Sequence, residues 1–184
     1  MKITICGPAA SGKGTVARMF AAEAGIEYVD LGLLFRLGAF VLETSAVKSL
    51  DQLLNLVRNG QAKYLWQNGT ASIVLHKIDI TPSLQTEKVA QTASILSSNA
   101  AAQKLLTTMA NLVLSKLDDV ICDGRNAGIT ILPNADYKFF VTAGLEERAR
   151  RRRLDILRLG GEDSYEKALR SIEERDKRDA ERTT

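Results

Sequence analysis

Residues 7–15 read Gly-Pro-Ala-Ala-Ser-Gly-Lys-Gly-Thr and directly follow a short apolar run. Two glycines five positions apart followed by lysine form the phosphate-binding loop pattern, which requires a strand before the loop and a helix after it. Glycine allows the backbone to turn several N–H groups toward one anion, and the N-terminal end of the helix adds positive potential there. The stretch therefore predicts a buried strand at 2–6, a helix from Gly12 to about Glu23, and a phosphate group bound between them.

The composition is that of an ordinary globular protein of one domain, with 184 residues, 45% hydrophobic and 26% charged. The N-terminal apolar run is too short for a signal peptide, and the other apolar stretches are too short for a membrane helix. Cys6 and Cys122 fit small buried residues of a reducing compartment. We therefore expect a cytoplasmic protein that does not contact a membrane.

The net charge of +3 is unevenly distributed. Six arginines and a single acid lie between Arg148 and Arg158, but acidic residues at 162–166 and 173–181 interrupt the basic run, and aromatic residues are not interleaved with it. A polynucleotide partner favours an uninterrupted basic patch. The pattern instead indicates a segment that handles phosphate, and no nucleic-acid partner is expected. We see no large exposed apolar stripe, so a monomer is expected.

Strands that alternate with helices predict one α/β domain over residues 1–184, a three-layer parallel sheet with helices on both faces. Asn68 and Gly69 predict a hairpin between strands 64–67 and 72–79, which we assign to an insertion rather than to the core. Gly160 and Gly161 predict a hinge between two helices. The other expected strands are 26–30, 119–123 and 136–141, and the other expected helices are 33–43, 86–96, 101–117, 145–159 and 164–178.

The residue after the loop lysine narrows the class of protein. Most loops of this kind place Ser or Thr directly after the lysine, where the hydroxyl holds Mg²⁺. Here that residue is Gly14, and the hydroxyl follows at Thr15. Gly-Lys-Gly-Thr resembles the nucleoside monophosphate kinases, in which the metal is held largely through water and by an acid at a strand end.

Further segments resemble one branch of these enzymes, the cytidylate kinases. Residues 30–36 resemble their Asp-Ser-Gly motif with its aromatic-arginine pair, and residues 123–126, Asp-Gly-Arg-Asn, resemble their Asp-Gly-Arg-Asp turn. Residues 146–152 resemble the start of their lid, and residues 174–182 resemble the helix that follows it. The resemblance runs in order along the whole chain. It implies a P-loop kinase fold with a nucleotide-monophosphate-binding insertion at about 36–100 and a mobile lid at about 148–175.

The resemblance also implies a reaction, the transfer of the terminal phosphate of ATP to CMP or dCMP with Mg²⁺. Phosphoryl transfer depends on positioning and on cations that stabilise spread-out negative charge. An acceptor that is itself a phosphate is already ionised, so it needs no general base. This agrees with a chain whose single histidine, His76, has no nucleophile or metal-ligand pattern around it.

Individual roles follow from these matches. Catalytic roles are expected for Lys13, Asp123, Arg125 and Arg152. The donor is expected to contact the loop and one arginine of the lid: Gly7, Pro8, Ala9, Ala10, Ser11, Gly12, Lys13, Gly14, Thr15 and Arg148. The acceptor is expected to contact Asp30, Arg36, Arg125, Asn126, Arg175, Asp179 and Arg182. Magnesium is expected near Thr15 and Asp123, largely through water.

Several positions depart from the family pattern. Leu31 replaces a serine, Asn126 replaces an acid, a residue near Gln85 replaces an arginine, and residues 107–109 lack another arginine. The family also continues beyond the position of Thr184 with one more strand and a helix. The sheet is therefore expected either to have four strands or to be completed in another way.

Other readings remain open. A phosphate-loop kinase for a different small acceptor keeps Lys13 and Asp123 but does not need Asp179. A diverged nucleotide-binding protein without turnover fits the changed acceptor positions, and a nucleic-acid binder would use the arginine-rich helix. Asp30 also fits a simple cap for the helix that follows it.

Overall fold

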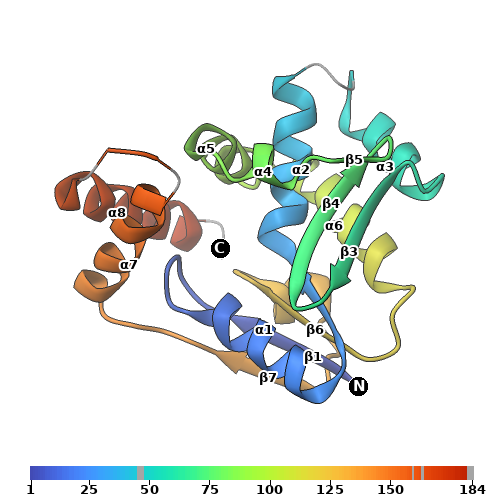
Figure 1. Cartoon of the computed structure of the whole chain (residues 1–184), viewed down its shortest axis with the longest axis horizontal. Coiled ribbons are helices and arrows are strands. Elements are labelled where there is room, and N and C mark those ends of the chain that lie inside the picture. The colour runs from blue at the N-terminus through green and yellow to red at the C-terminus, as the bar shows by residue number, and fades with distance from the viewer. Residues whose placement is uncertain (45–47, 159, 163, 182–184) are drawn as a thin grey trace.

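The structure is a computed structural model, and it describes residues 1–44, 48–158, 160–162 and 164–181 (Figure 1). The elements in chain order are β1 (Lys2–Cys6), α1 (Lys13–Ala24), β2 (Glu27–Asp30), α2 (Leu31–Glu43), α3 (Leu50–Arg58), β3 (Ala62–Gln67), β4 (Thr70–Leu75), β5 (Ile78–Asp79), α4 (Thr81–Leu84), α5 (Glu87–Leu96), α6 (Ala100–Leu114), β6 (Val120–Gly124), the π-helical turn η1 (Ala127–Ile131), β7 (Tyr137–Phe140), α7 (Leu145–Arg158) and α8 (Tyr165–Glu181).

A parallel sheet with the strand order β2-β6-β1-β7 forms the base of the fold, and it has four strands within the described part of the chain. This confirms the predicted α/β class. The register between β2 and β6 places Asp30 opposite Asp123 at the carboxyl ends of both strands. Ligands of open parallel sheets bind at that end, so two carboxylates lie where a ligand is expected.

The two faces of this sheet pack against different helices, because successive side chains of a strand point to opposite faces. Val29, Val120 and Cys122 belong to the larger apolar cluster, which includes buried residues of α2, α3 and α6. On the other face, a smaller cluster joins the sheet to α1: Ile3, Ile5, Ala17, Ala21, Tyr28 and Ile121.

The α1 face is only partly covered, which corrects our expectation that the chain has no large exposed apolar stripe. An apolar groove of about 480 Å³ runs between α1 and β7. Phe20 of α1 is 42% exposed, and Tyr137 and Phe139 of β7 are more than half exposed. An apolar strand has the same sequence pattern whether one of its faces or both are covered. The pattern of β7 therefore did not show that one face is exposed.

A second, antiparallel sheet of β3, β4 and β5 stands beside α2 and α3, away from α7 and α8 (Figure 1). The predicted turn at Asn68 and Gly69 is confirmed, but the single strand expected at 72–79 is wrong. His76 and Lys77 both have positive φ, 49° and 70°, and make a second two-residue turn. A His-Lys pair lacks the usual turn chemistry, so sequence reasoning did not predict it.

The hairpin is also not outside the core. Ile73 is fully buried and Leu75 is 7% exposed, and both belong to the larger apolar cluster. The expectation of an insertion rather than core is therefore wrong for the inner face of this sheet. That face packs on the same cluster as the parallel sheet.

Most predicted helices are confirmed to within a few residues, but α3, α4 and η1 were not expected. The signals for α3 are readable: the Ser49 hydroxyl accepts from Gln52 N, and apolar residues recur at 50, 53, 54 and 57. Helix α2 begins two residues before the expected start, because the Asp30 carboxylate caps it by accepting from Leu33 N.

Two expectations from composition can be compared with the described residues. Cys6 and Cys122 are free thiols, and Cys122 is buried. Among the helices that the structure describes, none combines the length and apolar character needed to cross a bilayer.

Candidate active site

The loop between β1 and α1 has the backbone geometry of an anion nest. Gly7, Ala10 and Gly12 have positive φ values of 153°, 56° and 95°, and α1 begins at Lys13. The Ser11 hydroxyl is buried and has no hydrogen-bond partner in the described part of the chain. A polar group left unsatisfied beside a helix N-terminus suits an anionic ligand, so the loop fits a nucleotide phosphate.

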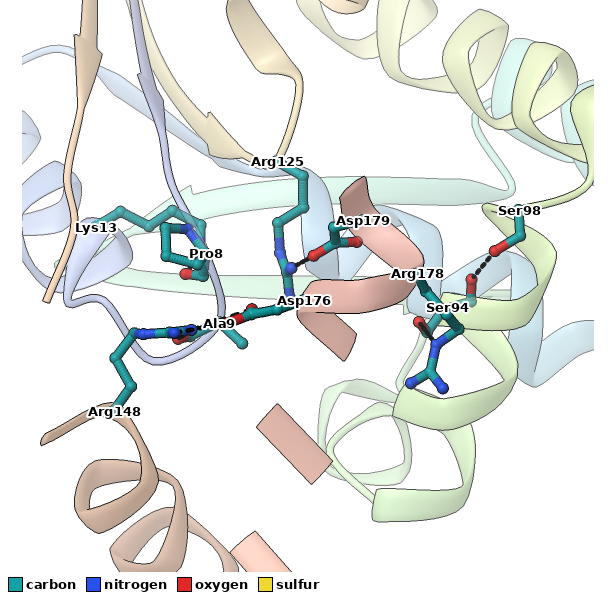
Figure 2. A network of polar contacts seen from close by, with 10 residues as sticks. All are labelled: Pro8, Ala9, Lys13, Ser94, Ser98, Arg125, Arg148, Asp176, Arg178 and Asp179. Atoms are coloured by element: carbon teal, nitrogen blue, oxygen red, sulfur yellow. Dashed lines mark hydrogen bonds and ion pairs between the residues drawn. The ribbon is translucent and has the colours of Figure 1, made fainter. Parts of the chain in front are cut away.

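Lys13 folds back over this loop. Its Nζ donates to the Pro8 carbonyl at 3.2 Å (Figure 2). Burial lowers the pKa of Lys13 below its ordinary value, and the charge of Asp123 opposes that shift. The lysine therefore lies at the loop as a partly desolvated cation.

Asp123 and Asp30 form the acidic part of the site. Asp123 is 5% exposed, and its Oδ1 accepts from the Tyr28 hydroxyl at 2.7 Å. Burial, and then the charge of Asp30, raise the pKa of Asp123 to about 7, while Lys13 acts in the opposite direction. Like charges on neighbouring strand ends favour a cation between or beside them. Asp30 both caps α2 and faces this region, so the simple capping alternative describes only part of its role.

A cavity of about 470 Å³ opens above the loop and the strand ends, bounded by α2, α5, α7 and α8. It brings together most of the residues predicted from sequence. These are Ala9, Ala10, Ser11, Gly12, Lys13, Gly14, Thr15, Asp30, Arg36, Asp123, Arg125, Asn126, Arg152, Arg175 and Asp179.

The cations of the cavity come from four helices, α1, α2, α7 and α8, and from the segment that follows β6. Arg125, just after β6, forms an ion pair with Asp179 of α8 (Figure 2). Arg152 of α7 forms an ion pair with Glu87 at the start of α5. These pairs join the arginine-rich helices to the opposite wall of the cavity and orient guanidinium groups toward it.

Three predicted site residues that the structure describes do not line the cavity. Gly7 and Pro8 lie at the base of the loop rather than along the cavity. Arg148 is also outside the cavity lining: it is 7% exposed, and both arms of its guanidinium donate to Asp176 of α8, at 3.0 and 2.6 Å. Its Nε donates to the Ala143 carbonyl at 3.1 Å. The role predicted for Arg182 lies outside the described residues.

Arg151, for which no role was predicted, contacts the phosphate loop. Its Nη1 donates to the Ser11 carbonyl at 3.0 Å, and it lines the cavity. Sequence reasoning gave roles only to Arg148 and Arg152 of this run. Only the packing of α7 against the loop shows which arginines of this run reach the site.

The sequence of this chain is similar to those of known proteins. A model of the cytidylate kinase family matches residues 3–184. The cytidylate kinase of Carboxydothermus hydrogenoformans is 33% identical over 184 residues, which cover 99% of this chain and 82% of that protein. Cytidylate kinase 1 of Haemophilus influenzae is 35% identical over 187 residues, covering 99% and 79%.

The chain belongs to the cytidylate kinase family. Among solved structures, a crystal structure of a Thermus thermophilus protein has 21% sequence identity and a TM-score of 0.48, and the match covers 95% of this chain and 78% of that one.

The positions where this chain departs from the cytidylate kinase motifs differ in their placement. Leu31 is 4% exposed, lines the cavity and packs closely on Gly124. Gln85 is exposed, and Met109 is buried in the larger apolar cluster. The wall from α5 and α6 carries neutral polar groups that sequence reasoning missed: Ser94, Ser97 and Gln103. These residues belong to no sequence motif. They face the cavity because α5 packs beside α2.

Proposed function

We propose that this member of the cytidylate kinase family transfers the terminal phosphate of ATP to CMP or dCMP and releases CDP or dCDP. One observation carries the proposal: a single cavity joins a phosphate loop, two strand-end carboxylates, and arginines from four helices and the segment after β6. The relatives that match this chain along almost its whole length are cytidylate kinases.

The two ends of the cavity suit the two nucleotides. The loop amides and Lys13 suit the phosphates of ATP, since the backbone there presents N–H groups at a helix N-terminus. Arg36, Arg125 and Arg175 suit the phosphate of the acceptor. Fixed cations offset the repulsion between two anionic substrates and hold them in line, which is the main contribution a protein makes to phosphoryl transfer.

The residues of the site also fit magnesium bound mainly through the nucleotide and water. Among the residues that the structure describes, three or more His, Cys, Asp or Glu side chains nowhere gather into a metal site. Mg²⁺ keeps several waters and takes only one or two protein oxygens in such enzymes. Thr15 and Asp123 line the cavity beside the loop and would supply them. When bound, Mg²⁺ neutralises charge on the transferring phosphate.

The domain organisation belongs to the same proposal. Residues of about 36–100 form the acceptor-binding insertion, and residues of about 148–175 form a lid that closes over the substrates and excludes water. The proposal also includes a cytoplasmic protein that is active as a monomer and has no nucleic-acid partner. Light scattering on the active fraction tests the oligomeric state.

The proposal is tested with a coupled assay on CMP, dCMP, UMP and AMP, with ATP and Mg²⁺. We expect CMP or dCMP to have the highest kcat/KM, and the absence of turnover of both cytidine nucleotides would refute the proposal. Titration calorimetry separates the alternatives. A kinase for another acceptor binds ATP and not CMP, whereas a binding protein takes up both without phosphoryl transfer that depends on Lys13.

A further inference from the structure

Tyr28 is a core residue that carries a hydroxyl group, which packing alone does not require. It is fully buried in β2, two residues before Asp30, and its ring lies in the α1 cluster. A phenylalanine would fill the same apolar volume. The Tyr28 hydroxyl instead reaches the end of the neighbouring strand and donates to Asp123 Oδ1 at 2.7 Å.

This hydrogen bond orients the carboxylate. With Oδ1 held by Tyr28, Oδ2 of Asp123 faces the first turn of α1: a Cβ built on Gly14 would lie 3.4 Å from Oδ2 and 3.5 Å from the Tyr28 hydroxyl. Asp123 Oδ2 and the Tyr28 hydroxyl therefore both lie beside the backbone of the first turn of α1, directly after the phosphate loop.

The second sheet contacts the Tyr28 ring through Trp66. The Trp66 ring of β3 packs edge-on against the Tyr28 ring, with the centroids 5.0 Å apart and an interplanar angle of 70°. Such aromatic pairs fix ring position as well as burying area. Trp66 thus restricts the ring whose hydroxyl holds Asp123.

We infer that Tyr28 is a positioning residue: braced by Trp66, it holds Asp123 with Oδ2 turned toward the nucleotide phosphates and their magnesium. The inference deepens the proposed function and rests on it for the identity of the reaction. A purely structural phenol would satisfy a buried carboxylate without affecting what that carboxylate does.

The test compares the wild type with Tyr28→Phe, which keeps the ring and removes only the hydroxyl. Loss of a hydrogen bond to a charged group is expected to lower kcat about tenfold. We expect the KM values for CMP and ATP to stay within about twofold, because Asp123 is positioned rather than removed. Calorimetry gives a second readout, in which Mg²⁺ strengthens ATP binding less in Tyr28→Phe than in the wild type. Tyr137→Phe, which removes an exposed phenol on β7, is the matched control and should leave all of these values unchanged.

A double-mutant cycle decides whether the effect passes through Asp123. In the Asp123→Asn background, Tyr28→Phe should change kcat less than about twofold. Trp66→Phe should lower kcat about threefold and leave the KM values nearly unchanged, as in Tyr28→Phe. It replaces Tyr28→Phe as the test if that variant does not fold.

Three outcomes would overturn the inference: wild-type kcat and Mg²⁺ effect in Tyr28→Phe, an equal loss in both backgrounds, or, where Tyr28→Phe does not fold, an unchanged kcat in Trp66→Phe. A wild type that phosphorylates neither cytidine nucleotide refutes the proposed function instead. The calorimetric comparison still decides the inference in that case.

Discussion

The phosphate loop and the acceptor wall are two sides of one cavity, but they are built in different ways. The loop uses the backbone of consecutive residues, with positive φ at Gly7, Ala10 and Gly12 and a helix that begins at Lys13. The acceptor wall instead uses side chains carried by α2, β6, α5, α6 and α8.

A site formed by the backbone of consecutive residues depends on few contacts with distant parts of the chain. A site made by side chains from distant segments depends on every contact that holds those segments in place. Two of the departures from the family pattern, Leu31 and Asn126, line the cavity among the residues proposed to bind the acceptor.

The largest effect is expected from Lys13→Met, which removes the loop cation and leaves the acceptor wall intact. Loss of one preorganised charge at the transferring phosphate should lower kcat about 10²–10³-fold. CMP affinity measured by calorimetry should change little. Lys116→Met, which changes an exposed lysine just after α6, is the control. A Lys13→Met enzyme that kept a substantial part of its kcat would contradict the assignment of the loop to the donor.

The next effect is expected from Arg125→Gln, which changes the acceptor side. Arg125 pairs with Asp179 and lies close enough to Lys13 to lower its pKa. The kcat/KM for CMP should fall about 10²-fold, because a charge-assisted contact is lost. ATP affinity should stay close to that of the wild type, and Arg58→Gln, which changes an exposed residue at the end of α3, should have no effect. If ATP binding weakened as much as CMP binding, the division into two sides would be wrong.

A smaller effect is expected from Gly38→Ala, which tests whether the acceptor wall depends on helix packing. A Cβ at Gly38 would lie 2.5 Å from Leu106 Cδ2, so the buried Leu106 side chain, or α6 that carries it, would have to shift. Alanine in a helix normally gains about 1 kcal/mol over glycine. Overpacking costs about 1–3 kcal/mol, so we expect a net loss of stability in urea unfolding.

The KM for CMP should also rise more in this variant than the KM for ATP, because α2 carries Arg36 and α6 carries Gln103. Gly144→Ala, where the added methyl group meets open space, is the control. A Gly38→Ala protein as stable as the wild type would show that the helices adjust without cost.

The smallest effect is expected from Cys122→Ala, one residue before Asp123 but on the opposite face of β6. Burial raises the pKa of Cys122 to about 12. In the unfolded chain the thiol ionises near its ordinary pKa of about 8.5, so between these values the unfolded state binds fewer protons than the native state. Stability is therefore lost as pH rises, by at most about 1.4 kcal/mol per pH unit.

Cys122→Ala should lose less stability above pH 9 than the wild type, and its activity near pH 7 should be unchanged. In the native wild type at pH 8, a thiol reagent should label Cys6 before Cys122. Fast labelling of Cys122 would show that this face of the sheet opens.

Sequence reasoning predicted much of the fold because its signals are local. The strand–loop–helix at the start and the hairpin at Asn68 follow from residues close together in the chain. Helix α3 was missed although its cap at Ser49 and its apolar spacing are readable. The turn at His76 and Lys77 was missed because its positive φ values are imposed by pairing with β5.

Residue type and short-range spacing were enough to predict the phosphate loop, most of the strands and helices in their order, and the type of charge around the ligand. Tertiary packing decided which arginines of α7 line the cavity and which face of β7 is left uncovered. It also decided that Tyr28 holds Asp123. These features depend on how elements far apart in the chain pack, and packing selects among side chains that look equivalent in sequence.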